Sequence, residues 1–328
     1  MATLKTLGER KIIEVLLGQF EKMSRMPIPF GDDVAGYPAG HKELFILKAD
    51  MLVGETDIPP GMTLSQAARK AVVMNISDFA AKGVKPKAIL VSLGLPNHLK
   101  KKDIVEIGAG LNAAAREYGT YILGGDTGEA SDLIISLSVF GTAEKGTVML
   151  RSGAEPGDLV AVSGCFGKTP SGLKILLDHL KASQEVREVL VDSVLMPKAR
   201  LREGLALGKT GAISAAIDSS DGLAWSLYEI SRASDVGIVV EKLPTAQEAL
   251  EFAGTNGLDP AELTLYGGEE YELVLTVKPR MWEKAVEASG RKLLLIGKVT
   301  AEKKVMFEYH GKRRVVEPRG YEHFLSEK

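Results

Sequence analysis

The strongest constraint on the fold is that short apolar runs alternate with longer segments in which apolar residues recur at helical spacing. This alternation restarts once along the chain. Residues 43–50 (ELFILKAD) have the composition of a strand, and Thr63 with Gln66 then forms a capping box that predicts the start of a helix. Strands and helices continue to alternate until about residue 146, where a turn-rich segment precedes a new apolar run. This pattern predicts two α+β domains, residues 1–146 and 147–328.

The spacing of apolar residues predicts the individual elements. Strands are expected at 43–50, 87–93, 121–123 and 133–140, and then at 159–163, 213–217, 236–241, 271–277, 293–299 and 304–309. Helices are expected at 8–22, 63–83, 101–119, 171–181, 199–208 and 222–234. The last two strands are close enough in sequence to form a terminal hairpin.

Composition excludes several classes of protein. The 41 basic and 43 acidic residues leave a net charge of −2, which gives no broad positive field for a nucleic acid or an anionic membrane. No window has the roughly 18 consecutive apolar residues of a membrane-spanning helix, and residues 1–5 lack a signal-peptide core. The single cysteine, Cys165, permits neither an internal disulfide nor cysteine-rich zinc ligation. We therefore expect a cytoplasmic protein without nucleic-acid or membrane partners.

Two glycine-rich segments resemble nucleotide-binding motifs in the wrong context. Residues 108–113 (GAGLNA) match a dinucleotide fingerprint, but they lie within a helical period and no strand precedes them. Close packing of helices is the better interpretation of these small residues. Residues 164–169 (GCFGKT) follow a strand, yet they are two residues short of the loop that cradles phosphate in a P-loop.

Acidic residues beside Gly, Ser or Asn recur at the edges of predicted elements. They lie in the segments GDD (31–33), AD (49–50), NISD (75–78), GGDT (124–127), DSSDG (218–222) and GGEE (267–270). Taken singly, each acidic residue is explained as a helix cap or a turn residue. We expect Asp50, Asp126 and Asp218 to end strands and to project into one cleft, where converging carboxylates need a counter-charge.

Oxygen ligands of this kind favour Mg²⁺, which commonly joins carboxylates to the phosphates of a substrate. The neighbouring glycines would let backbone amides approach an anion closely, and Asp221-Gly222 precedes a predicted helix. Arg151 would either clamp a phosphate or lie on the surface before a turn, and both interpretations stay open. The residues therefore predict a magnesium-dependent enzyme with a phosphate-bearing substrate.

The ordered motifs resemble those of the thiamine-monophosphate kinases, a family of the aminoimidazole-ribotide-synthetase-related, PurM-like superfamily. In chain order they are GDD (31–33), DMLV (50–53), NISDFAAKG (75–83), GGDT (124–127), RSGAEPGD (151–158), DSSDGL (218–223), GGEEYEL (267–273) and GYEHF (320–324). The resemblance covers nearly the whole chain. It implies a two-domain PurM-like architecture, with an N-terminal mixed sheet that pairs in a homodimer and a C-terminal α/β sandwich domain.

The same resemblance implies direct transfer of the ATP γ-phosphate to thiamine monophosphate with several Mg²⁺ ions and no covalent nucleophile. Residues 1–146 would bind ATP and Mg²⁺ and form the dimer, and residues 147–328 would contribute substrate and phosphate contacts. The implied metal ligands are Asp33, Asp50, Asp78, Asp126, Asp218 and Asp221. The implied ATP contacts are Gly125, Asp126, Arg151 and Ser220, and the implied substrate contacts are Glu269, Tyr321 and Asp57.

Three positions depart from the family pattern. Lys48-Ala49 stands where many members have hydroxyl residues, so Lys48 either interacts with phosphate or points away. The segment that contains Asp57 lacks a histidine that is often present, and Glu270 replaces an aspartate. Two alternatives remain open: another ATP-using PurM-like enzyme, of the aminoimidazole ribonucleotide synthetase type, and a non-catalytic nucleotide-binding relative.

Overall fold

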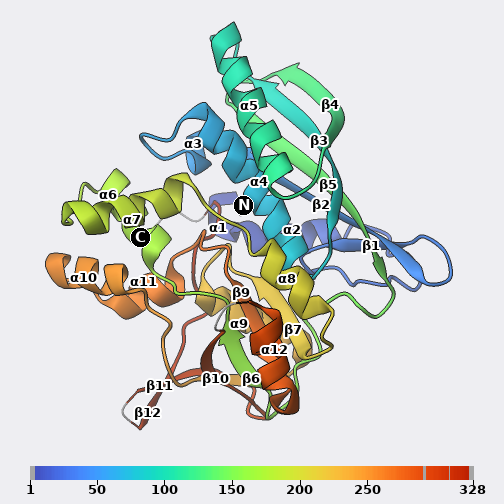
Figure 1. Ribbon diagram of the computed structural model, residues 1–328, viewed down its shortest axis with the longest axis vertical. Helices are drawn as coiled ribbons and strands as arrows, with labels where there is room; N and C mark the ends of the chain where they lie inside the picture. The colour runs from blue at the N-terminus through green and yellow to red at the C-terminus, as the bar shows by residue number, and fades with distance from the viewer. Residues whose placement is uncertain (1–3, 291–292, 310, 325–328) are drawn as a thin grey trace.

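The computed structural model describes residues 4–290, 293–309 and 311–324, which form two β-sheets with helices packed around them (Figure 1). The first sheet contains β1 (Ala35–Pro38), β2 (Glu43–Val53), β3 (Pro86–Leu95), β4 (Ile122–Glu129) and β5 (Ile134–Glu144). Its order is β1-β2-β5-β3-β4, and only the β3–β4 pair is parallel. This confirms the expectation of a mixed N-terminal sheet.

One face of this sheet packs against helices. The long helices are α4 (Leu64–Ala81), which begins with the predicted Thr63–Gln66 capping box, and α5 (Lys101–Glu117); the turn α3 (Gly54–Asp57) follows β2. Because α4 is rich in small apolar residues, it is buried over most of its length. It packs against β2, β5 and α5, and also against α8, β7 and β9 of the second half. This central helix therefore connects the two layers.

The second sheet has the order β12-β11-β8-β10-β6-β9-β7. Its strands are β6 (Leu159–Val162), β7 (Ile213–Asp218), β8 (Gly237–Val240), β9 (Leu273–Val277), β10 (Leu294–Thr300), β11 (Val305–Tyr309) and β12 (Lys312–Val315). Around it lie α6 (Lys168–Leu177), α7 (Gln184–Leu195), α8 (Leu201–Gly208), α9 (Leu223–Ser234), α10 (Gln247–Asn256), α11 (Pro260–Tyr266), the 3₁₀ turn η1 (Pro279–Met281) and α12 (Trp282–Ala288). The strands are short and apolar, so β6, β8 and β9 are buried almost throughout.

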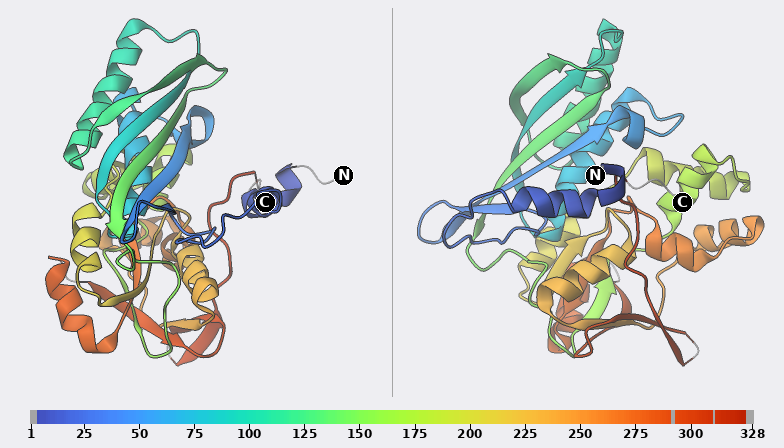
Figure 2. Two further views of the ribbon diagram at one scale, coloured as in Figure 1. Left: turned by 90° about the vertical axis from the view of Figure 1, so that its right-hand side faces the viewer. Right: turned by 180° about the vertical axis from the view of Figure 1, so that it is seen from behind.

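The N-terminal helices α1 (Leu4–Leu7) and α2 (Glu9–Leu17) lie outside both sheets, beside the C-terminal segment (Figure 2). Arg10 of α2 donates from its backbone nitrogen to Glu322 at 3.2 Å, and its guanidinium lies 3.7 Å from the ring centre of Trp225. The two ends of the described chain therefore meet beside α9. Within the described residues, no helix is long and apolar enough to cross a membrane.

Several predicted bounds were wrong. β2 continues past Asp50 to Val53, and β4 runs to Glu129, so neither Asp50 nor Asp126 ends its strand. The expected hairpin partner of 293–299 was also wrong, because β11 pairs with β8 in parallel and with β12, while β10 lies between β8 and β6. The helices α7, α10, α11 and α12 were not predicted. By contrast, the end of β7 at Asp218 and the start of α9 after Gly222 are as expected.

Candidate active site

A cavity of about 330 Å³, here called the acidic cavity, lies where β2, α4, β7, α9 and the C-terminal segment meet. Of the predicted site residues, it is lined by Asp50, Asp57, Asp78, Arg151, Asp218, Ser220, Asp221, Glu269 and Tyr321. Strand alternation places Asp50 on the buried side of β2, and Asp78 faces it from the last turns of α4. The fold therefore brings together most of the motifs that sequence analysis singled out.

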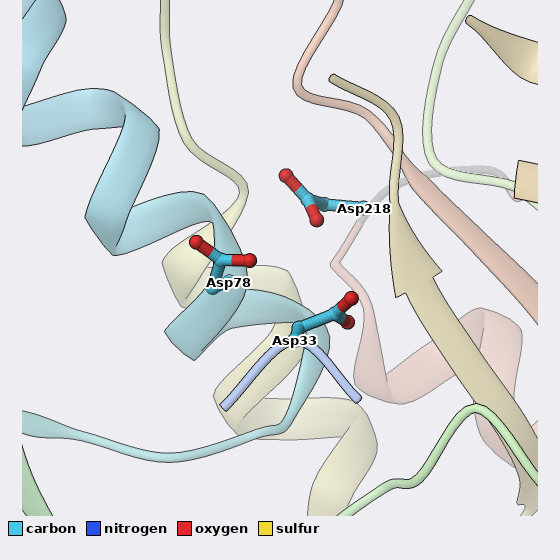
Figure 3. A group of neighbouring side chains, drawn as sticks. All are labelled: Asp33, Asp78 and Asp218. Atoms are coloured by element: carbon cyan, nitrogen blue, oxygen red, sulfur yellow. The ribbon is translucent and has the colours of Figure 1, made fainter. Parts of the chain in front are cut away.

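Three carboxylates from separate elements converge beside this cavity (Figure 3). Asp33 comes from the loop before β1, Asp78 from α4 and Asp218 from the end of β7. All three residues are buried, and each offers an oxygen atom within 4.8 Å of the others. Like charges this close require positive partners, whether side chains or metal ions.

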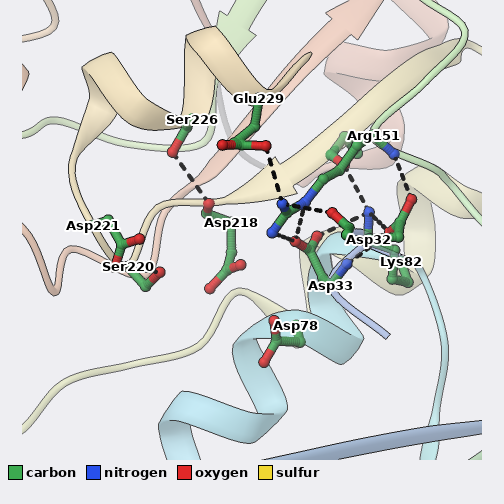
Figure 4. A network of polar contacts seen from close by, with 12 residues as sticks. Asp32, Asp33, Asp78, Lys82, Arg151, Asp218, Ser220, Asp221, Ser226 and Glu229 are labelled. Atoms are coloured by element: carbon green, nitrogen blue, oxygen red, sulfur yellow. Dashed lines mark hydrogen bonds and ion pairs between the residues drawn. The ribbon is translucent and has the colours of Figure 1, made fainter. Parts of the chain in front are cut away.

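Asp33 already has such partners in the protein (Figure 4). Lys82 Nζ lies 2.8 Å from Asp33 Oδ2 and 2.7 Å from Asp32 Oδ1, and it donates to the carbonyl of Ala216 at 2.8 Å. Arg151 donates from Nε to Asp33 Oδ1 at 2.6 Å. Burial opposes ionisation of Asp33, but the charges of Lys82 and Arg151 outweigh it and lower the pKa of this carboxyl group.

Asp78 and Asp218 are less well compensated. Burial raises the pKa of Asp78 well above its usual range, and the opposing charge of Lys48 does not cancel this rise. Burial and the nearby carboxylate of Asp33 raise the pKa of Asp218 to about 6. These two carboxylates therefore sit where an additional positive charge would be stabilising.

This arrangement fits a hard divalent ion. The facing donors are carboxylate oxygens from separate elements, which is the ligand chemistry of Mg²⁺, and histidine is not among the three converging ligands. Asp50 and Asp221 add further carboxylates from the same cavity wall. Of these, Asp221 is already paired with Arg10, with Arg10 Nη2 at 3.1 Å from Asp221 Oδ2.

Arg151 is not the free surface residue that one interpretation expected. Its side chain is 22% exposed; besides Asp33, it donates from Nη1 to the carbonyl of Gly31 at 2.8 Å and lies 3.5 Å from Glu229. The guanidinium thus joins the loop before β1 to α9 at the edge of the cavity. Contact between Arg151 and a phosphate stays a prediction, because its Nε and Nη1 groups already donate to Asp33 and to the carbonyl of Gly31.

The expected substrate residues Asp57, Glu269 and Tyr321 line the same cavity. Lys70, buried in α4, pairs with Glu269 at 2.5 Å and donates to the carbonyl of Asp57 at 2.8 Å. The carboxylate of Asp57 accepts a hydrogen bond from the backbone nitrogen of Val53 at 2.7 Å, so it also holds the end of β2. Tyr321 donates its backbone N–H to the carbonyl of Asp221, and the residue is 45% exposed.

Asp126 and Gly125 do not join this cavity within one chain. Asp126 pairs in register with Ser92, Ser92 with Ser136, and Ser136 with Met51, whereas Asp50 pairs with Leu137. Since paired residues share a face and neighbours along a strand alternate, Asp126 and Asp50 lie on opposite faces of the sheet. The expectation that Asp126 projects into the same cleft was therefore wrong. Gly125 is required locally, because a Cβ atom there would overlap the backbone of Val91.

The P-loop-like segment 164–169 holds a carboxylate of the protein itself. Glu270 accepts hydrogen bonds from the backbone N–H groups of Gly167 at 2.6 Å and Thr169 at 3.3 Å, at the start of α6. Burial, with the nearby charge of Glu272, raises the pKa of Glu270 to about 7. The structure thus agrees with the rejection of a P-loop, because an internal side chain fills the position of the anion.

Sequence reasoning named Arg151 and Lys48 but missed three other cations of the site, Lys70, Lys82 and Arg10. Lys70 and Lys82 carry charges into an otherwise apolar helix period, and both are almost completely buried. Burying an unpaired lysine costs free energy, so a lysine on the apolar side of a predicted helix indicates a buried charged partner. The positions of Lys70 and Lys82 could have been read in this way. The ion pairs of Arg10 with Asp221 and Glu229 had no comparable signal, because they join residues more than 200 positions apart.

Two family models match the chain: AIR synthase related protein, N-terminal domain, at residues 31–143, and AIR synthase related protein, C-terminal domain, at residues 155–310. A thiamine-monophosphate kinase of Nitrosopumilus maritimus is 37% identical over 287 residues, which cover 86% of this chain and 90% of that relative. A thiamine-monophosphate kinase of Pyrococcus horikoshii is 39% identical over 273 residues, covering 83% and 82%.

Solved structures show the same likeness. The structure described as AaThiL complexed with AMPPCP and TMP has a TM-score of 0.86 and 29% identity, covering 98% of this chain and 99% of that one. A thiamine monophosphate kinase from Aquifex aeolicus has a TM-score of 0.80 and 27% identity, covering 95% and 99%. Hydrogenase maturation proteins HypE share the fold at 20% identity and a TM-score of 0.69.

Proposed function

Because this chain belongs to the thiamine-monophosphate kinase family of AIR synthase related proteins, we propose that it transfers the γ-phosphate of ATP to thiamine monophosphate. The products are thiamine diphosphate and ADP. One observation carries the proposal: the acidic cavity joins carboxylates of four of the shared motifs. The relative with a TM-score of 0.86 was solved with AMPPCP and TMP.

The transfer needs positioning and charge neutralisation more than a covalent nucleophile. A phosphate oxygen of thiamine monophosphate forms a bond to the γ-phosphorus, and the bond from that phosphorus to the bridging oxygen of ADP breaks. Cys165 is not among the residues that line the acidic cavity, and burial raises the pKa of its thiol, which keeps it protonated. The residues of the site thus suit a direct transfer.

Mg²⁺ is the metal that the oxygen donors of the cavity fit. We assign its binding to Asp33, Asp50, Asp78, Asp218 and Asp221 at or beside the cavity, and a further binding contact to Asp126 on the outer face of the first sheet. When bound, it would neutralise charge on the transferred phosphate and on the phosphates of ATP. In the protein alone, Lys82 and Arg151 hold Asp33 in place, and α4 and β7 position Asp78 and Asp218.

The two substrates are assigned to different parts of the site. The proposed ATP contacts are Gly125, Asp126, Arg151 and Ser220, and the proposed thiamine monophosphate contacts are Glu269, Tyr321 and Asp57. The exposed ring of Tyr321 offers a face on which a cationic thiazolium can stack. Glu269 and Asp57 supply negative charge beside it, which favours a cationic ring.

A homodimer with joined N-terminal sheets belongs to the proposal, with ATP near that interface. The outer face of the first sheet, turned away from α4, exposes Phe45, Leu47, Met51 and Leu90. A contiguous apolar face on a sheet calls for a covering partner. We assign residues 1–146 to ATP and Mg²⁺ binding and to the dimer, and residues 147–328 to further substrate and phosphate contacts. Because ATP is a co-substrate, we infer that the enzyme works in the cytoplasm.

The proposal is tested by following ADP formation by the purified chain with Mg²⁺ and ATP. We expect ADP to form only when thiamine monophosphate is added, and thiamine diphosphate to appear in equal amount. ADP formation with formylglycinamidine ribonucleotide, and not with thiamine monophosphate, would favour the aminoimidazole ribonucleotide synthetase type. Nucleotide binding without turnover of either substrate would favour a non-catalytic relative.

A further inference from the structure

Lys48 interrupts the apolar inner face of β2. Strand alternation turns Leu44, Ile46, Lys48, Asp50 and Leu52 towards α4. The three apolar members of this set are buried at 3% exposure or less. The fold therefore places a lysine and an aspartate at positions that would otherwise belong to the core.

The ammonium group of Lys48 bridges carboxylates from two elements. Its Nζ lies 3.0 Å from Asp78 Oδ2 of α4 and 3.9 Å from Asp50 Oδ2 of β2, and its side chain is 21% exposed. A cation that joins carboxylates of separate elements beside a cavity has the contacts expected of a bound divalent ion. Lys48 therefore does not point away from the site, which was one of the two alternatives.

The other cations at this end of the cavity are engaged elsewhere. Lys82 contacts Asp32, Asp33 and a backbone carbonyl, and Arg151 contacts Asp33 and Glu229. Among the ion pairs of the described residues, Lys48 is the cation within 4.0 Å of Asp50 and Asp78. Its charge is thus the one that the protein itself supplies to this pair.

We propose that Lys48 is a built-in cation that takes the place of one divalent metal ion between Asp50 and Asp78. This inference rests on the proposed magnesium-dependent function and concerns how many ions the site holds. It assigns Lys48 as a positioning residue that holds the side chains of Asp50 and Asp78 in place. A chain with an uncharged residue at 48 should bind one more divalent ion.

Counting bound Mn²⁺ tests this directly. Mn²⁺ is titrated into the full chain and free Mn²⁺ is measured by electron paramagnetic resonance, with and without AMPPCP. We expect Lys48→Met to bind one Mn²⁺ more per chain than wild type, and Lys48→Arg to match wild type because it keeps the charge. Lys298→Met, which removes an exposed lysine paired with Glu241, is the matched control and should match wild type.

Equal numbers of Mn²⁺ in wild type and Lys48→Met, whatever their affinities, would overturn the proposal. Lys48→Gln is measured alongside, so that the result does not depend on the folding of one variant, which circular dichroism checks. Failure here is distinguishable from failure of the proposed function. The proposed function is tested by the turnover of thiamine monophosphate by wild type. The number of bound Mn²⁺ ions is also measured without nucleotide, so it does not depend on turnover.

Discussion

The residues of the acidic cavity differ in how their charges are balanced. Asp33 has two cationic partners, which lower its pKa, whereas the pKa values of Asp78 and Asp218 are raised. The difference arises because Lys82 and Arg151 both form ion pairs with Asp33, whereas among the ion pairs of the described residues neither pairs with Asp78 or Asp218. The deficit of positive charge lies where the proposed metal and phosphates would bind.

Replacing Asp78 tests this assignment. We expect Asp78→Asn to lower kcat by a factor on the order of 10² or more. The change removes a carboxylate that is proposed to hold Mg²⁺, and Mg²⁺ would neutralise the phosphates. Added Mg²⁺ should restore part of the activity. Asp178→Asn, an exposed change at the end of α6, should leave kcat unchanged. Steady-state kinetics over a range of Mg²⁺ gives the answer, and a wild-type kcat at limiting Mg²⁺ would remove Asp78 from the site.

Glu270 makes the stability of the protein depend on pH. Its pKa is about 7 in the folded protein, against an ordinary value of 4.5. Between these values the unfolded chain has lost the proton that the folded protein retains, so the free energy of unfolding falls as pH rises through this window. Above it, both states are ionised and the loss is complete.

Glu270→Gln should therefore remove this loss. From about pH 5 to about pH 8, the free energy of unfolding of wild type should fall by about 2–3 kcal/mol relative to the variant. Urea unfolding of both proteins at the two pH values measures the difference, and shared contributions from other groups cancel. Parallel pH profiles would show that Glu270 is ionised in the folded protein throughout the window.

At the scale of the element, α4 determines the site because it packs on both halves and carries Lys70, Asp78 and, at its end, Lys82. Close approach of α5 to α4 requires a glycine at 110, where a Cβ atom would lie 2.4 Å from the carbonyl oxygen of Ser65. The same helix has Gly108 at an exposed position, where a Cβ atom would meet open space.

These two glycines form a matched pair. Gly110→Ala should lower the free energy of unfolding by about 1–3 kcal/mol, because the added methyl group forces the helices apart. Gly108→Ala should raise it by up to about 1 kcal/mol through helix propensity. Denaturant unfolding compares them; equal effects would mean that the α4–α5 contact adjusts without cost.

Sequence periodicity predicted the elements better than their faces. The capping box located α4, and the apolar run located β7 and the aspartate at its end. The length of β4 was not predictable in the same way, because Gly124 and Gly125 have low strand propensity and indicate a turn. The face on which Asp126 lies depends on its register with β3, and that register is information from another strand.

At the scale of the whole molecule, the two halves were predictable because the alternation of elements restarts between them. The contacts that join them were not, since Lys82 reaches the carbonyl of Ala216 across 134 positions and Arg10 reaches Asp221 across 211. The uncovered apolar face of the first sheet is likewise a property of the assembled sheet. Its residues come from two strands, β2 and β3, that are separated in sequence.

That face predicts the oligomeric state. Leu47 is 45% exposed and Leu90 is 52% exposed. We expect sedimentation velocity to give twice the mass of one chain for wild type. We expect Leu47→Asp with Leu90→Asp to shift the protein to monomer, because charges would be buried against apolar side chains. Leu177→Asp changes a leucine of similar exposure on α6 and should remain dimeric. A monomeric wild type would refute the dimer.

The most direct measurement follows the γ-phosphate itself. ATP labelled with ³²P at the γ position is incubated with the chain, Mg²⁺ and thiamine monophosphate, and the products are separated. Direct transfer predicts that the label appears in thiamine diphosphate in equal amount to the ADP formed, with none released as inorganic phosphate. Label found in inorganic phosphate, with thiamine monophosphate unchanged, would contradict the central claim and indicate an ATP-hydrolysing relative.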